Sequence, residues 1–373
     1  SIGSELTRQI IKLNPKKILL IDISEYALYQ IHSELEEIKF KNKLKTEPEL
    51  IPIIASVQDK LKMTEIIKNF KPDIVYHAAA YKHVPLVEQN ICEGIKNNIF
   101  GTLNVSKISI DHNISNFVLI SSDKAVRPTN IMGASKRVAE LCLQALFEEK
   151  NSMRTKLSIV RFGNVLGSSG SVIPKFKKQI KDGGPVTLTH PEVTRYFMTI
   201  PEAAQLVIQA GAMAQGGDVF VLDMGDPVKI KDLVKKIVIL SGLTLKDKEN
   251  PNGDIKIVTT GLRPGEKLYE EVLLGDNPQP TIHKKIQKTK DPFIPWHKLS
   301  KSLTELKQYT DEEKIYEIID LMQKIVTGYN FNGEIVDQIF LKKNNQKYNR
   351  LKNQSLIKNY DKQDKKVIRF ERN

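Results

Sequence analysis

The sequence predicts an α/β protein built on a doubly wound parallel sheet, followed by a smaller C-terminal substrate-binding region. In the first half, short continuous apolar runs alternate with amphipathic segments of helical period, which is typical of parallel strands covered by helices on both faces. After about Gly167 this pattern loosens, and Gly and Pro become frequent around 183–185, 191 and 201. We therefore expect a doubly wound domain at 1–166, a second region at 167–328 and a basic, flexible tail at 329–373.

The expected elements follow from these runs in chain order. The apolar runs predict five strands, at 17–22, 50–55, 73–77, 116–121 and 157–162. The amphipathic segments between them predict helices at 5–14, 61–70, 92–112 and 133–150. The second region is expected to hold helices at 202–213, 230–241 and 311–327, and the tail is expected to be largely disordered or to contain one short helix.

Composition narrows the class of protein. A chain of 373 residues with 40% hydrophobic content can bury a sizeable core without disulfides, so Cys92 and Cys142 are interpreted as small apolar residues. Much of the net charge of +13 lies in the tail, and no basic segment outside the tail has interleaved aromatics, so a nucleic-acid partner is not expected. No apolar run is long enough to cross a bilayer. We expect a cytoplasmic location, at the cytoplasmic face of the inner membrane if membrane helices precede the chain.

The first residues look like the end of a phosphate-binding turn. The chain opens at Ser1 without Met, and Gly3 stands directly before an amphipathic helix. In dinucleotide folds the last glycine of such a turn lies where the helix N-terminus meets the pyrophosphate. We therefore expect the first strand and the earlier glycines to be missing from this chain. An ordinary helix start is the alternative interpretation of Gly3.

Three further positions fit a bound dinucleotide. Asp22 closes a strand about 20 residues on, where an acidic side chain binds the adenosine ribose and disfavours NADP; a simple strand-end carboxylate is the alternative. Asp59 is placed to accept from the adenine amine, or else to cap a helix. Ala78 and Ala79 follow a strand, where small residues permit close approach of a ligand or tight helix–sheet packing. The cofactor prediction is NAD, with no metal.

The most informative stretch is SSDKAVRPTNIMGASK at 121–136, which follows a strand and leads into a helix. Doubly wound folds place ligands at this end of the strands. Together with HAAAYKHVPLVE at 77–88, RFGNVLGS at 161–168, TRYFM at 194–198 and RPGEK at 263–267, it resembles the extended short-chain dehydrogenase/reductases. Within them it is most similar to the polysaccharide-biosynthesis UDP-N-acetylglucosamine 4,6-dehydratases, over roughly 1–328.

One position departs from the family pattern. Family members generally have a Tyr four residues before the active-site Lys, and here that place is Met132, with Lys136 after it. A thioether cannot accept a proton, so Met132 is not the usual base. The same replacement is known in the larger, membrane-anchored branch of these dehydratases, which the chain therefore resembles. An inactive enzyme is the alternative.

The resemblance implies a reaction and roles for this segment. The sugar is oxidised at C4, water is eliminated across C5 and C6, and hydride returns to C6. We assign Asp123 as the acid at C6 and Lys124 as the base at C5, which requires a depressed pKa for Lys124. Ser122 is expected to bind the sugar near O4, and Lys136 to hold the nicotinamide ribose. The base for the O4 proton stays open between Asp123 and a water held by Ser122 and Lys136.

The remaining motifs are assigned to the substrate, a UDP-sugar. Lys82 and His83 are expected to line the sugar pocket, although His83 is equally well explained as a structural histidine. The groups expected at the UDP end are Asn164, the backbone amides of 171–174, Arg195, Arg263 and Glu266. For the charged members of this set, solvated charges or turn residues are the alternative interpretation.

Two other functions remain in competition with dehydration. A UDP-sugar epimerase on the same fold would form the same 4-ketone but would need neither a C6 acid nor a C5 base. A non-catalytic UDP-sugar-binding relative would explain Met132 and the incomplete glycine turn. From the resemblance we also expect a homo-oligomer.

Overall fold

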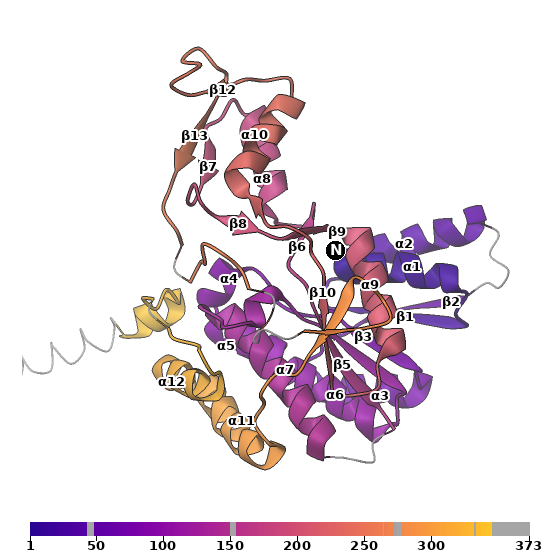
Figure 1. The fold of residues 1–373 in the computed structure, drawn as a ribbon. Coiled ribbons are helices and arrows are strands. Elements are labelled where there is room, and N and C mark those ends of the chain that lie inside the picture. The colour runs from indigo at the N-terminus through magenta and orange to yellow at the C-terminus, as the bar shows by residue number, and fades with distance from the viewer. Residues whose placement is uncertain are drawn as a thin grey trace, which may run out of the picture.

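The computed structural model describes residues 1–42, 48–149, 154–263, 265–271, 273, 278–331 and 333–344. Its centre is a six-stranded sheet in the order β14-β15-β10-β5-β4-β3 (Figure 1). Strands β3 (Ile74–His77), β4 (Asn116–Ile120), β5 (Lys156–Arg161) and β10 (Asp218–Leu222) run parallel. Strands β15 (Ile286–Thr289) and β14 (Gln279–Pro280) continue the sheet in antiparallel pairing. The predicted α/β class with a mainly parallel sheet is confirmed.

Both faces of this sheet are buried under helices. Within β4, Phe117 and Leu119 pack with α3 (Lys60–Phe70), α6 (Thr102–Asp111) and α7 (Ile131–Glu149). The alternating residues Val118 and Ile120 pack on the other face with α1 (Ile2–Ile10) and α9 (Ile200–Met213). This two-sided burial explains why the strands appear in the sequence as continuous apolar runs.

A second parallel pair lies beside the main sheet and shares no strand pairing with it among the described residues. It consists of β1 (Lys17–Asp22) and β2 (Glu49–Ile54), covered by α2 (Glu25–Asn42). Helix α1 and the short 3-10 turn after it connect the two sheets: Leu6 joins the cluster under β4, and Ile11 joins the cluster of β1 and α2. The start of α1 is thereby fixed against the main sheet.

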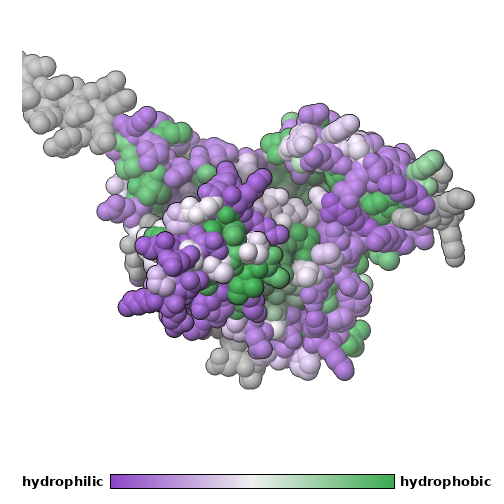
Figure 2. Space-filling view, turned by 90° about the horizontal axis from the view of Figure 1, so that it is seen from above, coloured by the Kyte–Doolittle hydropathy of each residue, from purple (hydrophilic) through white to green (hydrophobic). Residues whose placement is uncertain are grey.

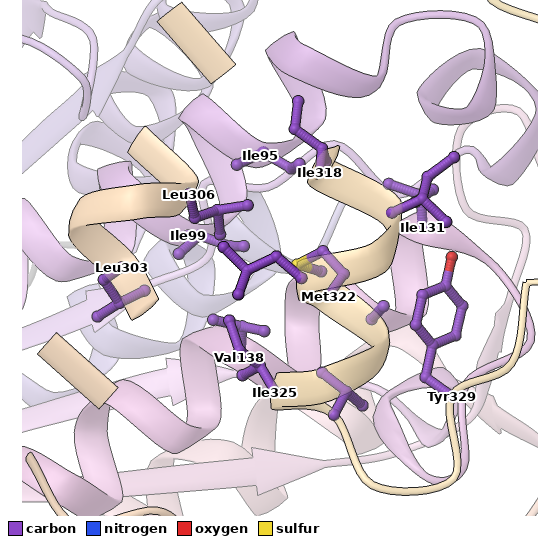
Figure 3. Close-up of a cluster of buried hydrophobic side chains, with 14 of the residues drawn as sticks. Ile95, Ile99, Ile131, Val138, Leu303, Leu306, Ile318, Met322, Ile325 and Tyr329 are labelled. Carbon is purple, nitrogen blue, oxygen red and sulfur yellow. The ribbon is translucent and has the colours of Figure 1, made fainter. Parts of the chain in front are cut away.

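Helix α7 is buried along nearly its whole length. Its outer face is covered by α4 (Val84–Glu88), α5 (Ile91–Ile95) and the hairpin of α11 (Trp296–Asp311) and α12 (Ile315–Ile325). In Figure 3, Met322 of α12 lies among side chains of α5, α7 and α11. Any pairing of two copies of this chain must therefore use a surface other than the outer face of α7.

An upper part stands above the ends of the parallel strands (Figure 1). Its core joins α8 (Val172–Lys181) and α10 (Ile230–Leu240) to a small sheet of β7 (Val186–Leu188), β12 (Leu245–Lys246) and β13 (Ile255–Thr259). Two short ladders connect it to the body: β6 (Asn164–Leu166) with β9 (Phe197–Thr199), and β8 (Thr194–Arg195) with β11 (Val228–Lys229). Seen from above in Figure 2, this face is mostly hydrophilic, with a hydrophobic patch near its centre.

The upper part is built from two separate stretches of chain. Between them and after them, α9, β10 and β15 return to the main sheet. The division of the chain at 166/167 and at 328/329 stays a prediction. Among the described residues, no helix combines the length and the apolar character needed to cross a membrane.

The elements agree closely with the sequence where burial is two-sided. All five predicted strands are present within one residue at each end. The helix predicted at 92–112 is three consecutive pieces, because a π-helical turn (Lys96–Gly101) joins α5 to α6. Helices α2, α8 and α11 were not predicted. Of the tail, residues 338–344 are helical, and 345–373 lie outside the described residues.

Candidate active site

A cavity of about 1190 Å³ lies between the carboxyl ends of the parallel strands and the upper part. It brings together most of the side chains that the sequence singled out. The lining includes Gly3, Ala78, Lys82, His83, Ser122, Lys124, Met132, Lys136, Asn164, Arg195, Arg263 and Glu266. These residues come from segments up to 263 positions apart, from Gly3 to Glu266, so their convergence is a property of the fold.

Four predicted site residues do not line this cavity. Asp22 ends β1 and accepts from the backbone N–H of Ser24 at 2.8 Å. Asp59 caps α3, accepting from Lys62 N at 2.9 Å, which was its alternative interpretation. Ala79 is exposed beside the lining residue Ala78, and Asp123 is fully buried. Roles for Asp22, Asp59 and Ala79 at an adenosine end stay predictions.

The catalytic segment forms a tight turn at the end of β4. Ser122 caps a single 3-10 turn over Asp123–Ala125, and its hydroxyl donates to Asp123 Oδ1 at 2.8 Å. Lys124 Nζ lies 3.0 Å from the same Oδ1 and 3.5 Å from Asn164 Oδ1. One carboxylate oxygen therefore accepts from both a hydroxyl and an amine that face the cavity.

The charge on Lys124 differs from the sequence expectation. Burial by itself lowers its pKa, but the neighbouring carboxylates of Asp123 and Glu270 outweigh burial and raise the pKa above its usual value. Glu270 Oε1 is 3.4 Å from Lys124 Nζ. The expected depressed pKa is wrong for this arrangement, because the expectation considered nearby cations and did not include the second carboxylate.

Asp123 lies behind the cavity wall rather than in it. Its Oδ2 is buried and has no hydrogen-bond partner among the described residues. The residue in front is Gly163, which lines the cavity; a Cβ added there would come within 3.1 Å of this Oδ2. The glycine thus leaves a path of approach to the carboxyl that any other residue would narrow.

The start of α7 is fitted closely against this turn. A Cβ on Gly133 would lie 2.2 Å from the carbonyl oxygen of Lys124, so only glycine permits this contact. Asn130 Oδ1 accepts from Gly133 N at 2.8 Å, and the buried Glu88 accepts from Ile131 N at 2.6 Å. These contacts fix where the first turns of α7 present Met132 and Lys136.

Lys136 is the most strongly perturbed amine in the cavity. It donates to the carbonyl of Ile120 at 2.6 Å, and burial lowers its pKa to about 8, with Glu140 acting in the opposite direction. Met132, one helical turn earlier, is 2% exposed. A thioether in that place leaves Lys136 without a titratable neighbour on the preceding turn.

Lys82 and His83 form the opposite wall. The side-chain amide of Asn98, on the π-helical turn, accepts from Tyr81 N at 2.8 Å and donates to Tyr81 O at 3.0 Å, which fixes this segment. Burial and Lys124 lower the pKa of Lys82, while burial and Lys82 lower that of His83. A Cβ on Gly170 would meet the His83 ring at 2.4 Å, so His83 packs directly against the upper part.

Two of the residues expected at the UDP end, Arg195 and Glu266, are engaged with the protein. Arg195 donates to the carbonyls of Thr194 and Leu268 at 2.7 and 3.1 Å, and to that of Lys267 at 2.8 Å. Glu266 accepts from Thr189 Oγ1 and from Arg263 N at 2.9 and 3.1 Å. Both side chains stabilise the 265–268 segment, so phosphate or ribose binding would add to or replace these contacts.

Sequence reasoning missed Glu270. It follows the RPGEK motif among exposed and charged residues, yet its side chain is only 5% exposed and contacts both Lys124 and Arg195. No local pattern marks it, because its burial depends on the turn after β4, about 145 positions earlier in the chain.

Comparison with known proteins gives a family match over most of the chain. A family model described as "Polysaccharide biosynthesis protein" matches residues 1–291. The capsular polysaccharide biosynthesis protein CapD of Staphylococcus aureus is 54% identical over 296 residues, which cover 79% of this chain and 47% of CapD. The chain thus spans about half the length of this relative.

Other relatives have names that specify reactions. A UDP-N-acetylglucosamine 4,6-dehydratase (inverting) of Campylobacter jejuni is 27% identical over 339 residues, 90% of each chain. A UDP-glucose 4-epimerase of Rickettsia rickettsii is 33% identical over 264 residues, 70% of this chain and 72% of the epimerase. Among solved structures, DesIV (dTDP-glucose 4,6-dehydratase) from Streptomyces venezuelae with NAD and TYD bound has a TM-score of 0.60 and 18% identity, covering 75% of this chain and 90% of DesIV. That likeness concerns the fold.

Proposed function

Because the chain belongs to the polysaccharide biosynthesis protein family of extended short-chain dehydrogenase/reductases, we propose that it is an NAD-dependent 4,6-dehydratase of a UDP-N-acetylhexosamine. The product would be a UDP-4-keto-6-deoxy sugar for surface glycan synthesis. The observation that supports this choice is the turn after β4. It sets the buried carboxyl of Asp123 3.0 Å from the amine of Lys124, which lines the cavity together with Lys136.

The residues present fit a nicotinamide dinucleotide. Gly3 begins α1 at the cavity wall, and a Cβ there would come within 3.8 Å of Ala78, so small residues border this edge. Asp22 ends β1 with an exposed carboxylate suited to ribose hydroxyls. Lys136 would hold the nicotinamide ribose. The dinucleotide would supply a hydride acceptor for oxidation at sugar C4 and a hydride donor for reduction at C6.

The chain's own side chains would manage the protons. Ser122 binds O4, and its hydroxyl passes the O4 proton towards Asp123, to which it is already hydrogen-bonded. Lys124 removes the proton at C5, which the 4-ketone makes acidic. As the C6–O bond breaks, Asp123 returns its proton to the departing hydroxyl, which leaves as water. Lys124 then gives a proton back to C5, so both residues end as they began.

Lys124 must lose its proton before it can act as a base. Its side chain is 22% exposed in the cavity, and a bound sugar would exclude the water that now reaches it. Loss of that water strengthens the burial effect, which favours the neutral amine. We propose that a filled cavity is the state in which Lys124 becomes the base.

Product analysis tests the proposal directly. The protein would be incubated with NAD⁺ and UDP-N-acetylglucosamine, and the sugar product identified by NMR. A 4-keto-6-deoxy sugar, which also absorbs in alkali, is expected. A C4 epimer alone would favour the epimerase, the alternative supported by the Rickettsia relative. Tight UDP-sugar binding without turnover would favour a non-catalytic relative.

A further inference from the structure

Glu270 does not line the cavity itself, but it contacts two residues that do, and the proposed mechanism does not use it. Its Oε1 lies 3.4 Å from Lys124 Nζ and 3.7 Å from Arg195 Nε, and its side chain is 5% exposed. The backbone of this segment is fixed by Arg195, which donates to the carbonyls of Lys267 and Leu268. Glu270 therefore reaches the reactive amine from the segment that Arg195 holds in place.

Lys124 is held between two carboxylates. Asp123, from the same turn, is 3.0 Å from Nζ, and Glu270 is 3.4 Å from it. A buried amine with one carboxylate partner would lose its proton more readily than an amine with two, because each carboxylate stabilises the charged form. Glu270 is thus in a position to control both where Nζ lies and whether it is charged.

Glu270 also connects Lys124 to the region expected at the UDP end. Arg195 lies 3.5 Å from Glu266 Oε1 as well as 3.7 Å from Glu270. The chain of contacts therefore runs from Glu266 through Arg195 and Glu270 to Lys124. Any group that draws Arg195 away would leave Glu270 paired with Lys124 alone.

We propose that Glu270 is a positioning residue for Lys124, fixing its amine at the cavity wall beside Asn164 and setting how readily that amine gives up its proton. This inference rests on the proposed function for its effect on catalysis, since it assumes that Lys124 removes the C5 proton. Its effect on the amine itself does not depend on any reaction.

Two measurements on the variant Glu270→Gln test it. The first is the pH midpoint of Lys124 acetylation by acetic anhydride, read by mass spectrometry of the peptide. The second is the pH dependence of kcat/KM with UDP-N-acetylglucosamine and NAD⁺. Loss of a carboxylate this close should lower the pH midpoint of acetylation by about one pH unit or more. The acidic limb of the kcat/KM profile should move to lower pH by a similar amount.

Glu271→Gln is the matched control. Glu271 pairs with Lys267 and Arg127 and has no contact with Lys124, so neither measurement should move. Glu270→Asp keeps the charge but withdraws it by one methylene, and should shift both values less, in the same direction. This second variant keeps the test available if the amide variant does not fold, as judged by circular dichroism.

The outcomes separate the two ideas. An acetylation midpoint that is the same in the parent and in both Glu270 variants overturns the inference. A shifted midpoint in a protein that yields no dehydration product supports the role of Glu270 and rejects the proposed function. A shifted midpoint together with a shifted acidic limb supports both.

Discussion

At the scale of single residues, the path to Asp123 depends on the missing side chain of Gly163. Its backbone is not in the left-handed conformation, so alanine adds no backbone strain there. The added Cβ would meet Asp123 Oδ2 at 3.1 Å and Tyr196 Cβ at 3.3 Å. It would occupy the approach that a substrate hydroxyl needs.

We therefore expect Gly163→Ala to lower kcat by about 10-fold or more, since small displacements of reacting groups have effects of this size. The dissociation constant for UDP should stay within about twofold, because the atoms nearest to the added Cβ belong to Asp123, Tyr196 and Met224, none of which is expected at the UDP end. Steady-state kinetics and calorimetric titration measure the two. An unchanged kcat would mean that Asp123 is not approached from this side.

The lowered pKa of Lys136 predicts a pH-dependent stability. Unfolded Lys136 holds its proton up to about pH 10.5, whereas the folded protein releases it near pH 8. Between these values the unfolded state binds more protons, so the free energy of unfolding should rise with pH. The full gain is on the order of 3 kcal/mol.

Lys136→Met isolates this effect. Relative to the variant, the parent protein should become more stable between pH 8 and 10, as measured by urea unfolding at several pH values. At pH 7 the parent protein keeps a charged amine in a buried place. The difference in the free energy of unfolding between the parent and Lys136→Met should therefore favour the parent least at this pH. A constant difference across this range would mean that Lys136 is not perturbed.

The sequence predicted the residues of the site better than their environments. Ser122, Lys124 and Lys136 converge because a strand–turn–helix pattern places them at one end of the sheet. The burial of Asp123 and the second carboxylate beside Lys124 were not predicted, because both depend on segments distant in the chain. Because the second carboxylate, Glu270, was not foreseen, the sequence predicted a lowered pKa for Lys124, whereas the structure gives a raised one.

At the scale of elements, the α11–α12 hairpin stabilises the helix that presents the active-site residues. Met322 is fully buried in the cluster that also contains Ile131 and Met132 at the start of α7. The hairpin therefore supports the cavity from behind without lining it.

Met322→Ala should lower the free energy of unfolding by about 2–5 kcal/mol, as buried large-to-small changes generally do. The exposed Glu317→Ala on the same helix should change it by less than about 0.5 kcal/mol and serves as the control. Urea denaturation followed by circular dichroism gives both values. Equal effects of the two substitutions would show that the hairpin is not cooperatively joined to the body.

Two of the helices that the sequence did not predict, α2 and α11, are half-exposed. Helix α11 buries only Leu299, Leu303, Leu306 and Thr310 of its 16 residues, and α2 leaves Tyr26 and Tyr29 exposed. Such elements are stabilised mainly by partners that the tertiary fold supplies.

At the scale of the whole molecule, a buried cluster of charges joins three distant segments. Arg161 at the end of β5 is fully buried and lies 2.5 Å from both Glu140 of α7 and Asp291. Glu140 also accepts from Ser121, next to the catalytic turn, at 2.6 Å. Burial raises the pKa of Glu140, but Arg161 and Arg137 outweigh it and lower the pKa to about 2.

Arg161→Met should destabilise the protein by about 3–5 kcal/mol, because it leaves buried carboxylates without their main partner. Lys307→Met, which breaks an exposed ion pair with Asp311, should change stability by about 1 kcal/mol or less. Chemical unfolding of the two variants provides the comparison. A loss of stability in Arg161→Met as small as that in Lys307→Met would indicate that water enters the buried charge cluster.

The course of the chain between β5 and β15 limits which segments can be exchanged between related proteins to make a working chimera. The two stretches that build the upper part, 172–199 and 228–259, leave the main sheet and return to it separately. Swapping only one of them between relatives would combine part of one cavity lining with part of another. A working chimera would need both transplanted together, with four junctions rather than two, and recombination at a single point would seldom produce one.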